Sequence, residues 1–384
     1  MIFGRSGTTM LVTLGQILLL ADVLQCAEGL LIVPDHILES KRSSVAGKRD
    51  GSDAGDSDWV KVTGWKSFLL HTATCAGLTV ESDAMSITKR DSDTVTDTTK
   101  AMFADILDDT LEINRGALDA ISTLESAWDK MSNQEELPAE ENTQIKFYMA
   151  MYGTFKKTDS TGMDRANKRI AQLKYFANEF VEGLDKEIFK IRIICDESAW
   201  ELSDYGDEGA WMLDGGAYNY VVKRTSTSQN SVCQNDKGEH SIIAFMVAGE
   251  GHDYMTLCPL GWERFAEAIP IPVQKARPLS DLEYEHLDDV TKKPADGVFV
   301  HELTHSNYFW EDLATDDVLL DDRTKAYGFE KVVDLAMQGN SEDDVSKLRA
   351  LKNADTYKYW AVGAFLSQCD WSTGSCMDPA DWKY

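Results

Sequence analysis

Two histidines and a glutamate are the residues of this chain whose types and spacing most clearly predict chemistry. They lie in the stretch VFVHELTHS, residues 298–306, as His301, Glu302 and His305. On an α-helix, residues four apart lie on the same face, so both imidazoles could bind one metal ion. Glu302 would then lie beside a metal-bound water as a general base. The pattern predicts a zinc hydrolase site with one Zn²⁺ per chain.

An ordinary surface helix with two exposed histidines could have the same sequence pattern. The apolar neighbours argue against that alternative, because they would bury the helix in a core. These neighbours are Val298, Phe299, Val300 and Leu303. A catalytic zinc site also needs a third protein ligand and an open position for water.

The possible sources of a third ligand differ in their spacing. A third histidine six residues after His305 is excluded, because Glu311 occupies that position. A glutamate on a later helix, as in gluzincins, is available in Glu330, four residues before Asp334. The remaining source is an aspartate soon after the second histidine, followed by Tyr-Gly.

Two later runs carry a resemblance to a known family. DDRTKAYGFEKVVDLA, residues 321–336, and NADTYKYWAV, residues 353–362, resemble the aspzincins, the family of deuterolysin and the fungal peptidyl-Lys metalloendopeptidases. In that family the His-Glu-x-x-His motif is followed by a GTxDxxYG element and then by Asn-Ala-Asp-x-Tyr on a later helix. The resemblance covers roughly residues 190–384.

The resemblance implies a role for each matching residue. His301 and His305 would bind zinc, and Glu302 would be the general base. Tyr327 would help to stabilise the oxyanion of the tetrahedral intermediate. The ligand aspartate departs from the family pattern, because Thr324 stands three residues before the tyrosine.

Asp322 is the expected third ligand. A small local insertion would let this aspartate, just upstream of the expected position, reach the metal. Asp321 is the alternative beside it, and Glu330 is the ligand expected of a gluzincin-like enzyme.

The resemblance also bears on substrate preference. Lysine-preferring members hold the substrate ammonium with an aspartate and a glutamate three residues later, and these positions are Asp355 and Lys358 here. Because Lys358 would repel a basic side chain, strict lysine preference is not expected. Asp355 could equally cap its helix or complement the helix dipole.

The order of helical and strand patterns predicts an α+β protein. Periodicity is helical from about 100 to 189, strand-like runs follow between 191 and 258, and helical patterns return from 298. The expected architecture is zincin-like and helix-rich, with a small, mostly antiparallel sheet and a His-Glu-x-x-His active-site helix.

Four parts are expected along the chain. Residues 1–27 have the pattern of a secretory signal peptide, since their apolar core is shorter than the ~20 residues of a membrane anchor. Residues 28–58 are expected to be a flexible segment and a candidate propeptide, because residues 39–58 are low in apolar content. Residues 59–190 form a helical N-terminal region, and 191–384 form the zincin-like metallopeptidase domain.

The cysteines indicate an oxidising compartment. Of seven cysteines, Cys26 lies in the signal peptide, and the remaining six could form up to three disulfides. Cys369 and Cys376 are close enough to close a short C-terminal loop, and Cys233 with Cys258 would tie together two candidate strands.

The net charge of −27 opposes binding to nucleic acid or to an anionic membrane surface. The expected protein is therefore a secreted, extracellular zinc endopeptidase whose partners are protein or peptide substrates. The altered element at 321–328 leaves two alternatives open. One is a non-catalytic zincin-fold protein that acts by protein binding, and the other is a gluzincin-like protease that uses Glu330.

Overall fold

The protein is described from a computed structural model. The described residues are 58–65, 67–76, 78–81, 86–89, 94–133, 135–153, 160–186, 188–203, 209–213, 221–223, 226–249, 252–339 and 348–380. The predicted signal peptide (1–27) and all but the last residue of the predicted flexible segment (28–58) lie outside them.

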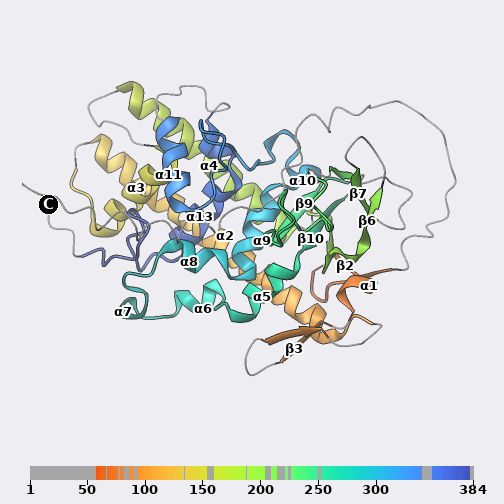
Figure 1. The fold of residues 1–384 in the computed structure, drawn as a ribbon. Coiled ribbons are helices and arrows are strands. Elements are labelled where there is room, and N and C mark those ends of the chain that lie inside the picture. The colour runs from red at the N-terminus through yellow and green to blue at the C-terminus, as the bar shows by residue number, and fades with distance from the viewer. Residues whose placement is uncertain are drawn as a thin grey trace, which may run out of the picture.

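A five-stranded mixed sheet lies at one end of the molecule, on the right in Figure 1. Its strands are, in spatial order, β1 (Trp59–Lys61), β2 (Phe68–His71), β5 (Ile191–Ile194), β10 (Asp253–Leu257) and β9 (Ala244–Val247). The edge strands β1 and β9 pair antiparallel, but β2 and β10 both run parallel to β5. The main sheet is thus mixed rather than mostly antiparallel. The parallel pair β2–β5 is possible because a long helical connection returns the chain in the same direction.

Two smaller sheets are antiparallel. One is the pair β3 (Leu78–Glu81) and β4 (Ser86–Lys89), and the other joins β6 (Trp200–Ser203), β7 (Ala210–Leu213) and β8 (Val221–Lys223). With the helices described below, they make the protein α+β and helix-rich.

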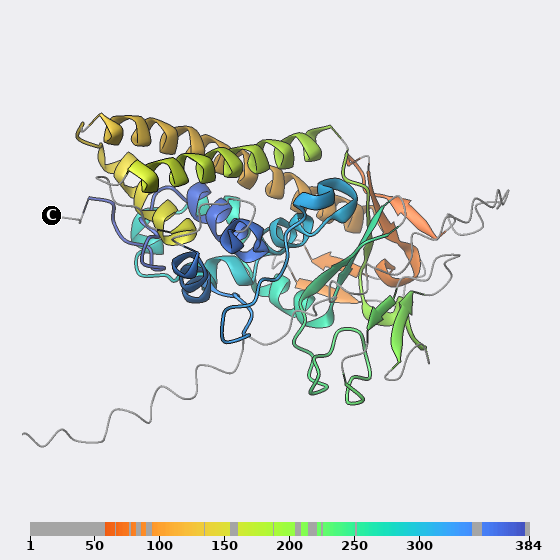
Figure 2. The same cartoon turned by 90° about the horizontal axis from the view of Figure 1, so that it is seen from above.

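Three long helices form the connection between β2 and β5. They are α2 (Asp97–Ser132), α3 (Ala139–Tyr152) and α4 (Ser160–Asp185). Thr96 caps the first of them by accepting the N–H of Thr99 at 3.1 Å. Apolar residues at helical spacing in α2 and α4, such as Phe103, Leu107 and Phe180, are buried. Figure 2 shows α2 and α4 lying alongside each other.

Two helices lie inside the molecule. Every residue of α13 (Ala354–Phe365) is buried, as is every residue of α9 (Ala295–Thr304) from Asp296 onward. Both pack against α2, and α9 also contacts β9, so α9 lies between the helices and the sheet (Figure 1). The largest cluster of buried apolar side chains accordingly includes residues from both 59–190 and 191–384.

Shorter helices complete the fold. They are α1 (Thr72–Cys75), α5 (Pro259–Glu267), α6 (Ile271–Lys275), α7 (Leu279–Leu282), α8 (Leu287–Lys292), α10 (Asn307–Trp310), α11 (Phe329–Gln338) and α12 (Arg349–Lys352), with 3-10 turns η2 (Glu197–Ala199) and η3 (Glu311–Leu313). Among the helices of the described ranges, none is long and apolar enough to cross a bilayer.

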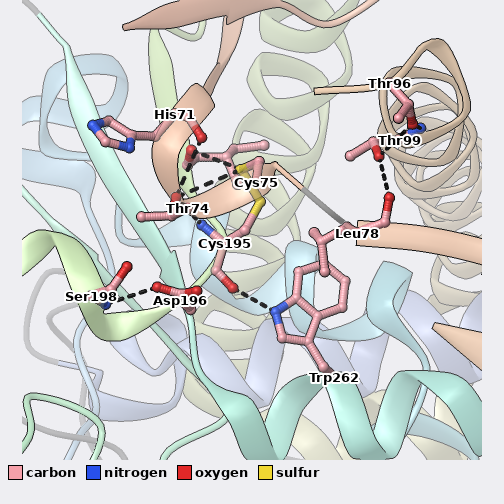
Figure 3. The surroundings of a disulfide bond; sticks show 11 residues. His71, Thr74, Cys75, Leu78, Thr96, Thr99, Cys195, Asp196, Ser198 and Trp262 are labelled. Atoms are coloured by element: carbon pink, nitrogen blue, oxygen red, sulfur yellow. Dashed lines mark hydrogen bonds between the residues drawn. A yellow bond between two sulfur atoms is a disulfide. The ribbon is translucent and has the colours of Figure 1, made fainter. Parts of the chain in front are cut away.

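Three disulfides join the six cysteines. Cys369–Cys376 and Cys233–Cys258 are the two pairs suggested from the sequence. The third, Cys75–Cys195, joins α1 to the residue after β5 and is drawn in Figure 3. Beside it the Cys195 backbone donates to Thr74 Oγ1 at 3.0 Å and accepts Trp262 Nε1 at 2.6 Å. Such a set of disulfides is typical of an oxidising, extracellular compartment.

Candidate metal centre

Helix α9 positions the two histidines and the glutamate. The helix starts after its N-cap residue Pro294, which makes no side-chain capping hydrogen bond, and ends at Thr304, with His305 as its C-cap. The side chains of His301 and Glu302 are almost completely buried, at 4% and 1% exposure. The helical spacing expected from the sequence is therefore present, inside the core rather than on a surface helix.

Three atoms converge at this helix. His301 Nε2 and His305 Nε2 are 3.2 Å apart, and each is 3.4 Å from Asp317 Oδ1. In a regular tetrahedron with metal–ligand bonds of about 2.0–2.1 Å, the ligand atoms lie about 3.3 Å apart. The two histidines and Asp317 thus form a group that could hold a metal ion.

The aspartate at the histidines is Asp317, not Asp322. Asp322 is exposed, and its Oδ1 accepts the backbone N–H and the hydroxyl of Thr324 at 2.8 and 2.7 Å. Leu319 bridges Lys325 antiparallel, so the residues between them form a turn whose tip points to solvent. Arg323 supplies the left-handed residue of this turn, with φ of 67°.

The two alternative ligands are also outside the group. Asp321, in the same turn, pairs with Arg349 at 2.7 Å on the surface. Glu330 lies in the first turn of α11 and is exposed. Neither carboxylate is therefore brought to His301 and His305.

Backbone hydrogen bonds hold Asp317 from both sides. The preceding residue, Asp316, donates its N–H to Lys352 at 2.7 Å and accepts the N–H of Ala354 at 3.0 Å. The following residue, Val318, donates its N–H to Asn353 Oδ1 at 3.1 Å. The Asn-Ala-Asp run at 353–355 therefore fixes the segment that carries Asp317.

The outer nitrogen of each histidine lies close to an oxygen atom. His305 Nδ1 lies 2.8 Å from the carbonyl oxygen of Thr315, and His301 Nδ1 lies 2.8 Å from Asp355 Oδ1. A carbonyl or carboxylate at Nδ1 favours a proton on that nitrogen and leaves the Nε2 lone pair for a metal. This arrangement fits a histidine pair that could hold a metal ion.

Both carboxylate oxygens of Asp355 have partners within the protein. Besides His301, its Oδ1 lies 2.6 Å from Lys358 Nζ, and its Oδ2 accepts the N–H of Gly328 at 3.1 Å. Both side chains of the Asp355–Lys358 pair are buried. Asp355 therefore lies against His301, and Lys358 neutralises its carboxylate.

Electrostatics link these groups closely. Burial alone would lower the pKa of His301, but the carboxylates of Asp317 and Asp355 outweigh burial and raise this pKa to about 9. Burial would likewise raise the pKa of Asp317, yet His305, His301 and Lys325 hold it well below its usual value. Without a metal, the group is therefore an ion-paired cluster at neutral pH.

Glu302 differs from the other carboxylates. Burial raises its pKa above the ordinary value. Its buried Oε2 has no hydrogen-bond partner within the described part of the chain. Because an unpartnered buried carboxylate oxygen is costly, this atom fits a site completed by a metal and a water.

Tyr327 lies beside the same group. Its ring centroid is 6.1 Å from that of His301, and its hydroxyl accepts a hydrogen bond from Lys325 Nζ at 3.1 Å. Gly328 follows with φ of 88°, a conformation that favours glycine, and this bend starts α11. The Tyr-Gly pair thus directs the tyrosine toward α9 and the next helix away from it.

Sequence reasoning missed Asp317, although a signal for it is present. Thr315-x-Asp317 repeats the threonine-x-aspartate of the aspzincin element, but Tyr327 follows the aspartate by ten positions instead of three. The added residues form the turn that contains Asp322. Lys325, which contacts the same group, was not singled out from the sequence.

Comparison with protein-family models and with curated proteins gave no match to this chain. The aspzincin resemblance accordingly depends on its motifs and on the geometry of the residues that those motifs contain.

Proposed function

We propose that the protein is a secreted, zinc-dependent endopeptidase of the aspzincin type. The observation that carries the proposal is the convergence of His301, His305 and Asp317 at tetrahedral ligand spacing, with the buried Glu302 next to His301 on α9. Imidazole and carboxylate are ligands that zinc accepts. The three disulfides support the extracellular assignment.

The chain's own residues would divide the chemistry among them. Zinc, when bound, would lower the pKa of a water molecule and polarise the scissile carbonyl. Glu302 would accept the proton of the attacking water and pass it to the leaving amine. Tyr327 would donate its hydroxyl to the oxyanion that forms at the carbonyl. Asp355 and the Thr315 carbonyl would keep both imidazoles in the required tautomer.

The first experiment measures metal content and casein hydrolysis on the purified secreted protein and on Glu302→Gln. We expect one zinc per chain in both proteins and a loss of hydrolysis of more than about 100-fold in the variant. Zinc without hydrolysis in the wild type, or hydrolysis that survives in Glu302→Gln, would contradict the proposal.

A non-catalytic protein that binds a partner is the second candidate. Two lysines close to the metal group favour it, because a cation near the site disfavours a divalent ion. Lys358 pairs with Asp355, and Lys325 Nζ lies 3.8 Å from Asp317 Oδ2. Zinc content near zero in the experiment above would support this candidate.

A further inference from the structure

Lys325 and Tyr327 lie on the same side of an extended segment. Lys325 bridges Leu319, and Ala326 between them donates its N–H to Val318 at 2.9 Å. In an extended chain alternate side chains point the same way, and the intervening one points to the opposite face. Ala326 is fully buried on that opposite face. Lys325 and Tyr327 therefore both face the aspartate of the metal group.

The contacts of Lys325 connect this aspartate to the tyrosine. Its Nζ lies 3.1 Å from Tyr327 Oη, 3.8 Å from Asp317 Oδ2 and 5.0 Å from the centroid of the Tyr327 ring. An ammonium group has three donors and no acceptor. The Tyr327 oxygen must therefore accept from Lys325, and its own proton must point away from the ammonium.

Tyr327 is a hydrogen-bond donor at neutral pH, because the ordinary pKa of a tyrosine hydroxyl is about 10. A hydrogen bond from a cation polarises the hydroxyl that accepts it and strengthens the bond that this hydroxyl donates. The Lys325 ammonium thus both orients the O–H of Tyr327 and makes it a better donor.

We propose that Lys325 is a positioning residue that directs the Tyr327 hydroxyl proton at the oxyanion of the scissile carbonyl. The proposal rests on the proposed peptidase function and adds a residue to it. Asp317 is a competing partner for both side chains. Its Oδ2 lies 3.8 Å from Lys325 Nζ, and its carboxylate also accepts a hydrogen bond from the Tyr327 hydroxyl. For Lys325 the shorter distance, with hydrogen-bond geometry, is the one to Tyr327.

The test compares Lys325→Met, Lys325→Arg, Tyr327→Phe and the double variant Lys325→Met/Tyr327→Phe. Lys331→Met, which removes the same charge from α11, is the matched control. Peptide hydrolysis is measured at saturating zinc, with metal content determined for each protein. In parallel, calorimetry measures binding of a phosphonate peptide, whose tetrahedral anionic phosphorus mimics the oxyanion without any turnover.

We expect Lys325→Met to lower kcat by about 10-fold to 100-fold, less than the loss of a whole oxyanion donor, with KM changed less than about twofold. Phosphonate affinity should fall with kcat, Lys325→Arg should restore most of both, and Lys331→Met should change neither. In the Tyr327→Phe background, Lys325→Met should have little further effect, because its target is gone.

Three results would overturn the proposal. An equal loss from Lys325→Met with and without the tyrosine hydroxyl would show that the lysine acts elsewhere. Loss of zinc from Lys325→Met would place its role at Asp317. Unchanged kcat and phosphonate affinity in Lys325→Met would show that Lys325 has no role at the oxyanion. Failure of the proposed peptidase function would look different, because the wild type itself would then hydrolyse no peptide. Zinc content and phosphonate binding would still be measured for every protein in that case.

Discussion

The side-chain oxygen of Asn353 accepts the backbone N–H of Val318 at 3.1 Å and thereby holds the residue next to the metal-group aspartate. The amide nitrogen of Asn353 donates to Ala326 at 3.3 Å and to Thr356 Oγ1 at 3.0 Å. One fully buried side chain thus joins both strands of the turn at 318–326 to the start of α13. The aspartate position depends on an asparagine 36 residues later.

Asn353→Ala is therefore expected to weaken zinc binding without touching a ligand. The change removes three hydrogen bonds and leaves buried backbone groups unpartnered, at a cost of about 1–3 kcal/mol for each group that finds no substitute. Zinc affinity measured by competition with a chelator should fall, and the melting temperature should fall with it. Asn133→Ala, at the exposed C-cap of α2, is the control and should change neither by much. Unchanged zinc affinity in Asn353→Ala would show that the turn holds its position without this side chain.

The identity of the third ligand is tested by four single substitutions. Asp317→Asn should lower zinc affinity by more than about 100-fold, which is the upper range for losing an outer-shell partner. Asp322→Asn, Asp321→Asn and Glu330→Gln should leave zinc content at the wild-type level, because these side chains lie at the surface. Loss of zinc from Asp322→Asn, with Asp317→Asn unaffected, would restore the ligand expected from the sequence.

Local spacing made the α9 part of the site predictable. His301, Glu302 and His305 are fixed relative to one another by one helical turn, and the apolar neighbours correctly indicated that the helix is buried. Closeness in the chain suggested the disulfide Cys369–Cys376, and two neighbouring strand patterns suggested Cys233–Cys258. In each case the residues concerned are close in sequence, so local geometry decides.

Features set by distant contacts could not be read in the same way. Asp317 reaches the histidines because residues 352–354 hold its neighbours, and no local rule places those segments together. The parallel pairing of β2 with β5 and the disulfide Cys75–Cys195 both join segments separated by the helices α2–α4. Tertiary packing of those helices, rather than any strand pattern, decides that the sheet is mixed.

Zinc binding should release protons at neutral pH. In the metal-free protein His301 has a pKa of about 9, so its imidazole is charged at pH 7, whereas a zinc ligand must be neutral. Zinc affinity should therefore rise about tenfold per pH unit below 9 from this group alone. Calorimetry in two buffers of different ionisation enthalpy should detect at least about one proton released at pH 7. No release would mean that His301 is already neutral before zinc binds.

The raised pKa of His301 also makes the stability of the metal-free protein depend on pH. The pKa of His301 is raised on folding from the ordinary 6.5, so its contribution to stability is fully present below about pH 6.5 and is lost as pH rises through about 9. Urea unfolding with a chelator present should show stability decreasing across this window. Asp355→Asn, which removes a carboxylate that raises this pKa, should flatten the dependence.

Removal of the disulfide Cys75–Cys195 should destabilise the protein more than removal of Cys369–Cys376. The two bonds close loops with sequence separations of 120 and 7 residues, and loop entropy predicts a difference of about 2.5 kcal/mol in the free energy of unfolding. All four cysteines are buried, so paired substitutions to alanine avoid placing a hydroxyl in the core. Urea unfolding of the two double variants measures the difference directly. A larger loss from Cys369→Ala/Cys376→Ala would show that native contacts of the C-terminal loop, rather than the unfolded chain, dominate. A loss as large as expected for Cys75→Ala/Cys195→Ala would show that this disulfide acts mainly by restricting the unfolded chain.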